Sequence, residues 1–222
     1  MKSLLSLRNP VLCLATSGIL STAYSAPSLD LLNAFTFADG AKQGGIEIVS
    51  YTPDNFTVAG IYVSDPDGED SNPATFGVQV LDLGSTGALT ERFQIDLNPA
   101  NTGINALSSM SSVALDPLGR DFGVVTVIPS DNTGTPGKLA FFNYNTGTVL
   151  STLSVGYHPD SVRFSADGNT LYVANEGEFK ASSAQAPGSI SIVNVANINL
   201  SNISGSTTTQ TSIFQGPISP QA

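Results

Sequence analysis

Residues Gly156–Val195 read GYHPDSVRFSADGNTLYVANEGEFKASSAQAPGSISIVNV, and this stretch decides the fold. Residues 161–164 and 189–195 alternate polar and apolar side chains, a period of two that is typical of half-buried strands. The ADGN sequence at 166–169 predicts a tight turn, because Gly and Asn accept positive φ and Asp bonds to its own backbone. Residues 171–174 then resume an extended strand. The stretch therefore predicts one antiparallel unit of four-stranded type.

The same order of strands and turns occurs twice upstream, over residues 46–97 and 112–155. Val49, Val113 and Val162 occupy one position of the repeat, at intervals of 64 and 49 residues. Tyr51, Leu115 and Phe164 occupy the next inward-facing position. A period near fifty residues with four strands per unit is typical of propeller blades, whereas a β-sandwich with similar strand spacing is the alternative. We predict an all-β fold, a partial β-propeller of about three four-stranded antiparallel blades.

The first 25 residues resemble a secretory signal peptide. Lys2 and Arg8 form a positive segment, residues 11–20 are apolar, and small residues at Ala23 and Ser25 fit cleavage after Ser25. The apolar run is too short to span a bilayer comfortably. An uncleaved anchor or a buried first helix is the alternative. We predict a secreted protein, extracellular, at the cell surface or periplasmic, with no transmembrane segment after cleavage.

The chain is acidic, with 18 Asp and Glu against eight Lys and Arg in 222 residues. Cleavage would remove Lys2 and Arg8, leaving six basic residues and a net charge of −12. Such a surface repels phosphate backbones, so we expect no nucleic-acid partner. Cleavage would also remove Cys13, the one cysteine of the sequence, so the exported core relies on packing alone. The expected partner is an extracellular or surface ligand.

The blades are predicted over residues 44–200, after a lead-in at 26–43. Residues 201–222, rich in Ser and Thr, form either a polar tail or the start of a further blade. Propellers typically close with four to eight blades, and three blades leave open edges. We therefore expect a fragment whose missing blades lie in a downstream chain; oligomerisation that completes the ring is the alternative.

Several stretches resemble the choice-of-anchor I domain, a family of secreted bacterial β-propellers of the YVTN/WD40-like class, related to mesenchyme-specific cell-surface glycoproteins. GGIEIVSY at 44–51 resembles its start, and GKLAFF at 137–142 resembles its blade-two strand. Its most recognisable block is matched by Pro159–Asp160, Phe164, Asp167–Gly168 and ANEGE at 174–178. The sequence departs from the family at Phe179, where Pro is usual, and at 185–188, which lack the usual acidic residue.

Acidic residues in two places are candidate metal ligands. Asp160, Glu176 and Glu178 could converge at a propeller rim and hold Ca²⁺, which takes six to eight oxygen ligands; alternatively, Asn175 and Glu176 brace the turn through backbone hydrogen bonds. A second candidate set resembles an EF-type loop, although its Gly68 comes early and no Glu follows at the twelfth position. Its members are Asp65, Asp67, Glu69 and Asp70, and the alternative is a solvated insertion.

The sequence contains no recognisable catalytic set. His158 is its single histidine and is interpreted as a turn residue before Pro159. There is no G-x-S-x-G motif and no P-loop, and too few His and Cys for a zinc site. We therefore predict a non-catalytic role in recognition, adhesion or scaffolding. The family resemblance implies an alternative, a Ca²⁺-assisted phosphoesterase of alkaline phosphatase or phytase type, because members often carry that label.

Overall fold

The computed structural model describes residues 33–35, 43–44, 46, 48–52, 56–64, 75–178, 186–200 and 208–212. Three predicted features lie outside these residues: the signal peptide over 1–25, most of the lead-in at 26–43, and the acidic loop with Asp65, Asp67, Glu69 and Asp70.

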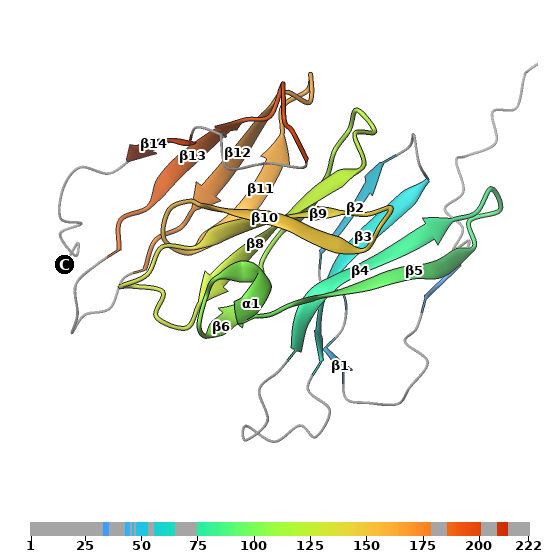
Figure 1. Cartoon of the computed structure of the whole chain (residues 1–222), viewed down its shortest axis with the longest axis horizontal. Coiled ribbons are helices and arrows are strands. Elements are labelled where there is room, and N and C mark those ends of the chain that lie inside the picture. Colours follow the sequence, from blue (N-terminus) through green and yellow to red (C-terminus); the bar gives the residue numbers. More distant parts are fainter. Residues whose placement is uncertain are drawn as a thin grey trace, which may run out of the picture. The chain divides into compact units, whose positions relative to one another are not determined.

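The described strands form three antiparallel sheets (Figure 1). The first sheet contains β1 (Gln43–Gly44), β2 (Val49–Thr52), β3 (Thr57–Ser64), β4 (Thr75–Leu83) and β5 (Leu89–Leu97). The second contains β6 (Leu107–Ser109), β7 (Val113–Leu115), β8 (Phe122–Pro129), β9 (Lys138–Asn143) and β10 (Thr148–Ser154). The third contains β11 (Pro159–Phe164), β12 (Thr170–Asn175), β13 (Ser189–Asn194) and β14 (Thr208–Ser212).

Each sheet is built around one four-stranded meander, namely β2-β3-β4-β5, β7-β8-β9-β10 and β11-β12-β13-β14. The first strands of the three meanders are neighbours, since β7 contacts both β2 and β11. Successive four-stranded sheets that pack in this way are the blades of a β-propeller. The predicted fold class is therefore confirmed: the described residues form an all-β, partial propeller of three blades.

The turn between β11 and β12 shows how local sequence sets the strand ends. Asp167 Oδ1 accepts hydrogen bonds from the Ser165 hydroxyl (2.6 Å) and from the Asn169 amide (3.1 Å). Gly168 adopts φ +70°, a left-handed conformation that glycine reaches without a Cβ penalty. The ADGN turn is thus observed where the sequence predicts it.

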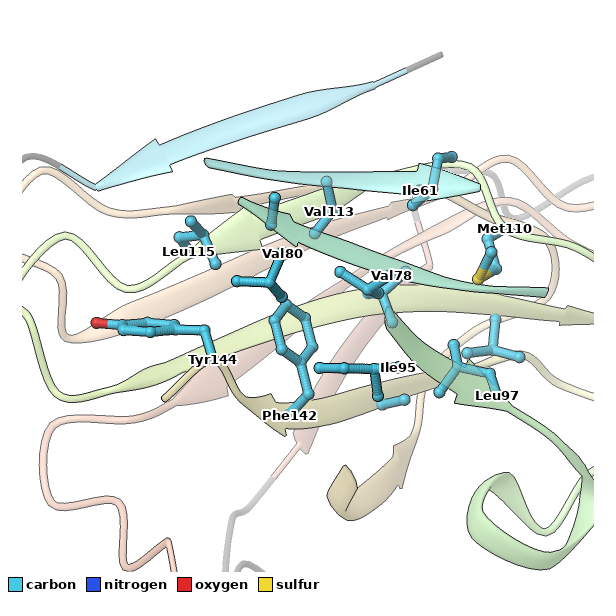
Figure 2. Close-up of a cluster of buried hydrophobic side chains, with 14 of the residues drawn as sticks. Ile61, Val78, Val80, Ile95, Leu97, Met110, Val113, Leu115, Phe142 and Tyr144 are labelled. Atoms are coloured by element: carbon cyan, nitrogen blue, oxygen red, sulfur yellow. The ribbon is translucent and has the colours of Figure 1, made fainter. Parts of the chain in front are cut away.

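The first and second sheets share one hydrophobic core (Figure 2). Phe142 and Tyr144 are fully buried in it, and Met110 fills its edge at 5% exposure. The other main contributors are Ile61, Val78, Val80, Ile95 and Leu97 from the first sheet, with Val113, Leu115, Val125 and Val127 from the second. Burial of this apolar face stabilises the contact between the two blades.

The second sheet is also covered on its opposite face by the third sheet. All eight residues of β8 are buried, which explains its nearly unbroken apolar sequence FGVVTVIP. Val124 belongs to the core shared with the third sheet, whereas Val125 belongs to the core shared with the first. Between the second and third sheets, the rings of Phe122 and Phe164 pack edge to face, with centroids 5.8 Å apart.

Arg120, which forms an ion pair with the buried Asp116 of the same blade, also joins the second and third sheets. The Arg120 guanidinium donates to both carboxylate oxygens of Asp116, at 2.6 and 3.1 Å, and Asp116 is fully buried. The same guanidinium donates to the carbonyls of Val195 (2.7 Å) and Gly168 (2.6 Å) on the third sheet. It also lies 5.2 Å from the Phe122 ring centroid, within cation–π range. Arg120 thus fixes how one blade sits on the next.

The structure corrects the expectation for the C-terminal segment. Residues 201–222 were expected to form a tail or the start of a further blade, but β14 (Thr208–Ser212) pairs with β13 and completes the third blade. Its TTQTS sequence is rich in β-branched Thr, which favours strands, and pairing occupies the open edge of β13. The polar composition of this segment had concealed its strand.

Two short elements between the first and second blades were also not predicted. The helix α1 (Pro99–Thr102) begins at Asn98, whose Oδ1 accepts from the Ala100 and Asn101 amides, and is followed by Gly103 at φ +63°. The strand β6 follows it and pairs with the end of β8. Four helical residues and three strand residues are too short to give a clear periodic signal.

Val49 and Tyr51 are not inward-facing, contrary to prediction. They are 64% and 47% exposed, although Val113 and Leu115 at the equivalent positions of the second blade are 4% exposed. Val113 and Leu115 face the preceding sheet, whereas no described sheet precedes the first one. The opposite face of β2 turns toward β7, where the Ser50 hydroxyl accepts a hydrogen bond from the Leu115 amide (2.9 Å).

Candidate functional site

The family-like ANEGE block lies at one end of the third sheet, in the connection that leaves β12. Three loops meet there: residues 130–137 between β8 and β9, 155–158 before β11, and the described residues 176–178 after β12. Glu178 draws them together, because its Oε2 accepts from Asn132 Nδ2 and lies within hydrogen-bond distance of His158 Nδ1, both at 3.0 Å. We call His158, Glu178 and Asn132 the loop cluster.

Backbone geometry sets the position of the loop cluster. His158 has φ +49°, which is uncommon for a residue with a side chain, and Gly177 has φ +78°. The Glu176 amide donates to the His158 carbonyl (2.9 Å), and the Gly177 amide donates to the Tyr157 carbonyl (3.1 Å). Backbone hydrogen bonds alone therefore connect the loop after β12 to the loop before β11, independently of the side chains of the loop cluster.

Glu178 is also fixed from the other side. Its backbone exchanges two hydrogen bonds with Ala186, at 2.9 and 3.1 Å, in an isolated antiparallel bridge. The side chains of His158 and Glu178 are only 26% and 23% exposed. Glu178 is therefore held by its backbone and by two side-chain partners at once.

Asn175 lies beneath the loop cluster and is only 3% exposed. Its Oδ1 accepts from the Gly156 amide (3.1 Å), and its Nδ2 donates to the hydroxyls of Ser189 (3.1 Å) and Ser191 (2.9 Å) and to the Ser189 carbonyl (3.3 Å). These bonds tie β12 to β13 and to the chain that enters β11. Ser189 and Ser191 can be buried here because the Asn175 amide satisfies them.

The predicted ligand set Asp160, Glu176 and Glu178 is dispersed in the structure. Asp160 is exposed where β11 shifts register against β12, and Glu176 is also exposed. Among the described residues, no group of three or more His, Cys, Asp or Glu side chains lies close enough together to hold a metal ion. Of the three, Glu178 alone belongs to the loop cluster, while the Glu176 amide braces His158 as the alternative interpretation of this turn expects.

Sequence reasoning missed two members of the loop cluster. His158 was interpreted as a turn residue, and its positive φ agrees with that, but its imidazole also pairs with Glu178. Asn132 is 46 residues from Glu178 in a loop of polar residues, and no motif marks it. The only available signal was topological, since loops that follow the second strands of neighbouring blades emerge at the same end.

A carboxylate that orients an imidazole is the arrangement by which many hydrolases position a general base. Such chemistry also needs a nucleophile or an activated water within reach of the imidazole. Within the described part of the chain, no hydroxyl or thiol side chain forms a hydrogen bond with His158. The hydrogen bonds that are present connect three loops, so the arrangement acts as a brace.

Comparison with known protein families gives one match. The family model of the choice-of-anchor I domain matches residues 47–217, a range that includes β14. No curated protein matches the chain. Across the described residues, no helix has the length and apolar character needed to cross a bilayer.

Two solved structures are similar at low identity. A crystal structure of Sqt1 from Chaetomium thermophilum is 16% identical, with a TM-score of 0.47, and the match covers 81% of this chain and 39% of that one. A crystal structure of a eukaryotic initiation factor is also 16% identical, with a TM-score of 0.34 and coverage of 76% and 44%. The chain spans less than half the length of either protein. Because the family model matches well over half of the sequence, the chain belongs to the choice-of-anchor I domain family.

Proposed function

We propose that this chain is part of a secreted or cell-surface β-propeller that serves recognition or adhesion and does not catalyse a reaction. The observation that carries the proposal is the use of polar side chains at the loop-bearing end of the second and third blades. Asn175, His158 and Glu178 form hydrogen bonds with neighbouring loops. Side chains that are engaged in these hydrogen bonds hold the loops in fixed positions and so provide a rigid surface for a ligand.

Sequence and charge support the same proposal. The signal-peptide pattern over residues 1–25 favours export, and the acidic composition favours solubility outside the cell. Rigid blades that present loops at one end are well suited to recognition, because binding residues concentrate on loops positioned by a scaffold. The loop cluster fixes three such loops relative to one another.

Export can be tested by expressing the full chain in a bacterial host and analysing the culture medium and periplasm. We expect a protein that begins at Ala26, as read by N-terminal sequencing. A matched variant with Ser25→Leu places a large residue at the cleavage site and should accumulate uncleaved. Wild-type protein that stays in the cytoplasm with Met1 intact would contradict the export part of the proposal.

Catalysis can be tested with the same exported protein against phosphate monoesters and diesters, with Ca²⁺ or with a chelator. We expect no turnover above the rate of a Glu178→Gln variant, which keeps the size of the side chain and removes its charge. Ca²⁺-dependent turnover that this substitution abolishes would favour the phosphoesterase alternative. Isothermal titration with Ca²⁺ alone then shows whether the chain binds the ion without any reaction.

A further inference from the structure

The imidazole of His158 has one nitrogen engaged in the loop cluster and one that is open to solvent. Nδ1 lies 3.0 Å from Glu178 Oε2. Nε2 forms no hydrogen bond within the described part of the chain, yet the buried side-chain atoms there that lack a partner are Thr52 Oγ1 and Gln79 Oε1. Because Nε2 is not among those buried atoms and the side chain is 26% exposed, Nε2 is accessible to solvent.

The hydrogen bonds of Glu178 fix the tautomer of this imidazole. Oε2 accepts from Asn132 Nδ2 as well as lying against His158 Nδ1. An ionised carboxylate accepts hydrogen bonds and cannot donate one, so the hydrogen between Glu178 and His158 is on Nδ1. A neutral imidazole carries a hydrogen on only one nitrogen. Nε2 therefore retains its lone pair and is a hydrogen-bond acceptor whose orientation is set by the bond that the other nitrogen makes.

The charge around His158 limits which groups can bind to this acceptor. The exposed charged side chains of the described loop residues and of the start of β11 are the carboxylates of Asp131, Asp160 and Glu176. No Lys or Arg occurs in residues 130–137, 155–158 or 176–178. An anionic group would be repelled by these carboxylates and would find no hydrogen on Nε2. A hydroxyl or ammonium group can donate to Nε2 without either penalty.

The backbone of His158 also favours a role for the ring beyond bracing. Its φ of +49° is uncommon for a residue with a side chain, whereas glycine adopts such a conformation freely. The bond from the Glu176 amide to the His158 carbonyl joins the two loops without the imidazole. Sparsely populated backbone conformations cluster at sites that contact ligands, and binding residues concentrate on loops that a scaffold positions.

We propose that His158 Nε2 is a ligand-contacting atom of the recognition surface and accepts a hydrogen bond from a hydroxyl or ammonium group of the ligand. Glu178 and Asn132 are positioning residues, because they hold the ring as the Nδ1–H tautomer without contacting the ligand. This inference rests on the proposed function and adds to it the chemical class of the group that is recognised.

The tautomer can be measured by nitrogen-15 NMR, because His158 is the single histidine of the sequence. An untagged, labelled sample at about pH 9, above the range in which histidine ordinarily titrates, gives one pair of ring-nitrogen signals. We expect the chemical shift of a hydrogen-bearing nitrogen at Nδ1 and that of an unprotonated nitrogen at Nε2. Free histidine shows the reverse, with the Nε2–H tautomer prevailing.

Glu178→Gln tests whether the carboxylate sets the tautomer. Glutamine keeps the length of the side chain, but its amide group can either donate or accept, so both signals should move toward the Nε2–H form. Glu176→Gln is the matched control, because Glu176 is exposed and lies outside the loop cluster. It should leave both chemical shifts unchanged. Circular dichroism and urea unfolding show whether each variant is folded.

The class of ligand can be tested with three small probes added to the wild-type protein. Ethylene glycol presents a hydroxyl, methylammonium an ammonium group and methyl phosphate an anion. A hydrogen bond donated to Nε2 moves its signal toward that of a hydrogen-bearing nitrogen. We expect this movement with ethylene glycol or methylammonium and none with methyl phosphate, and the donor that acts identifies the group. Glu178→Gln should lose the response.

Two results would overturn the proposal. An Nε2–H tautomer in the wild-type protein would show that Glu178 does not set the state of the ring. An Nε2 signal that responds to neither donor, or that responds equally to methyl phosphate, would show that this nitrogen does not recognise the ligand. Neither result bears on export or turnover, which the assays of the proposed function test separately.

Discussion

Replacing Asn175 by alanine should lower the free energy of unfolding by about 3 kcal/mol. The side chain accepts one hydrogen bond through Oδ1 and donates through two N–H groups that three acceptors share, so it amounts to about three hydrogen bonds of about 1 kcal/mol each. The Gly156 amide would lose its acceptor, whereas the hydroxyls of Ser189 and Ser191 can rotate toward other partners. These two effects act in opposite directions, so the expected loss stays at about 3 kcal/mol.

Equilibrium unfolding in urea measures this loss. With a slope of about 2 kcal/mol per molar, the midpoint should fall by about 1.5 M while the slope stays the same. Asn194→Ala is the matched control, because Asn194 is exposed on the neighbouring strand and its Oδ1 accepts one bond, from the Ala196 amide (2.9 Å). It should lower the free energy of unfolding by less than about 1 kcal/mol.

Asn175→Asp separates hydrogen bonding from volume. An aspartate retains the acceptor for the Gly156 amide but cannot donate to the Ser189 carbonyl, so the variant should be less stable than wild type while the Gly156 amide stays protected from hydrogen exchange. If Asn175→Ala unfolds within about 0.5 kcal/mol of both wild type and the Asn194→Ala control, Asn175 does not hold the end of this blade, and the reasoning about the site fails.

Three other perturbations test separate parts of the fold. Gly177→Ala should destabilise by about 2 kcal/mol in urea unfolding, because the residue has φ +78° and an added Cβ would collide with the Ala186 carbonyl. Arg120→Ala should cost about 3 kcal/mol in the same assay, because it removes the charge partner of the buried Asp116 and the bonds to the Val195 and Gly168 carbonyls, whereas a loss below about 1 kcal/mol would show that Arg120 does not join the blades. Burial and a hydrogen bond to a carboxylate raise the pKa of Tyr62 well above its ordinary 10.0. Its neutral phenol thus contributes stability that is intact below pH 10 and lost as the pH rises further, a dependence that Tyr62→Phe should weaken and that absorbance of ionised tyrosine can follow.

The blades could be predicted because their strands and turns carry local signals. The alternation in FGVQVLDL and the turn residues Asp167 and Gly168 agree with β4 and with the β11–β12 turn. The fourth strand of the third blade could not be predicted, because Thr208–Ser212 lacks apolar alternation and depends on the open edge of β13. Local sequence patterns were sufficient to predict strands that have an apolar face. They were insufficient for a polar strand that forms only because it pairs with a neighbouring strand.

The site was harder to predict because it depends on hydrogen bonds between residues that are far apart in the sequence. Hydrophobic alternation in residues 189–195 draws attention to Ile190 and Ile192, yet the buried face of β13 carries Ser189 and Ser191. The Asn175 amide makes that burial possible, and its two serine partners are 14 and 16 residues away. A sequence pattern reports apolarity, but it does not report which polar groups will satisfy one another.

The same limit explains the error at Val49 and Tyr51. Their alignment with Val113 and Leu115 is correct, since the strand pairing places all four at equivalent positions of their blades. Whether such a position is buried depends on a neighbouring sheet, and for the first blade no described sheet supplies one. Repeat position therefore predicts which face of a blade is apolar, while exposure in the structure identifies the face that still lacks a partner.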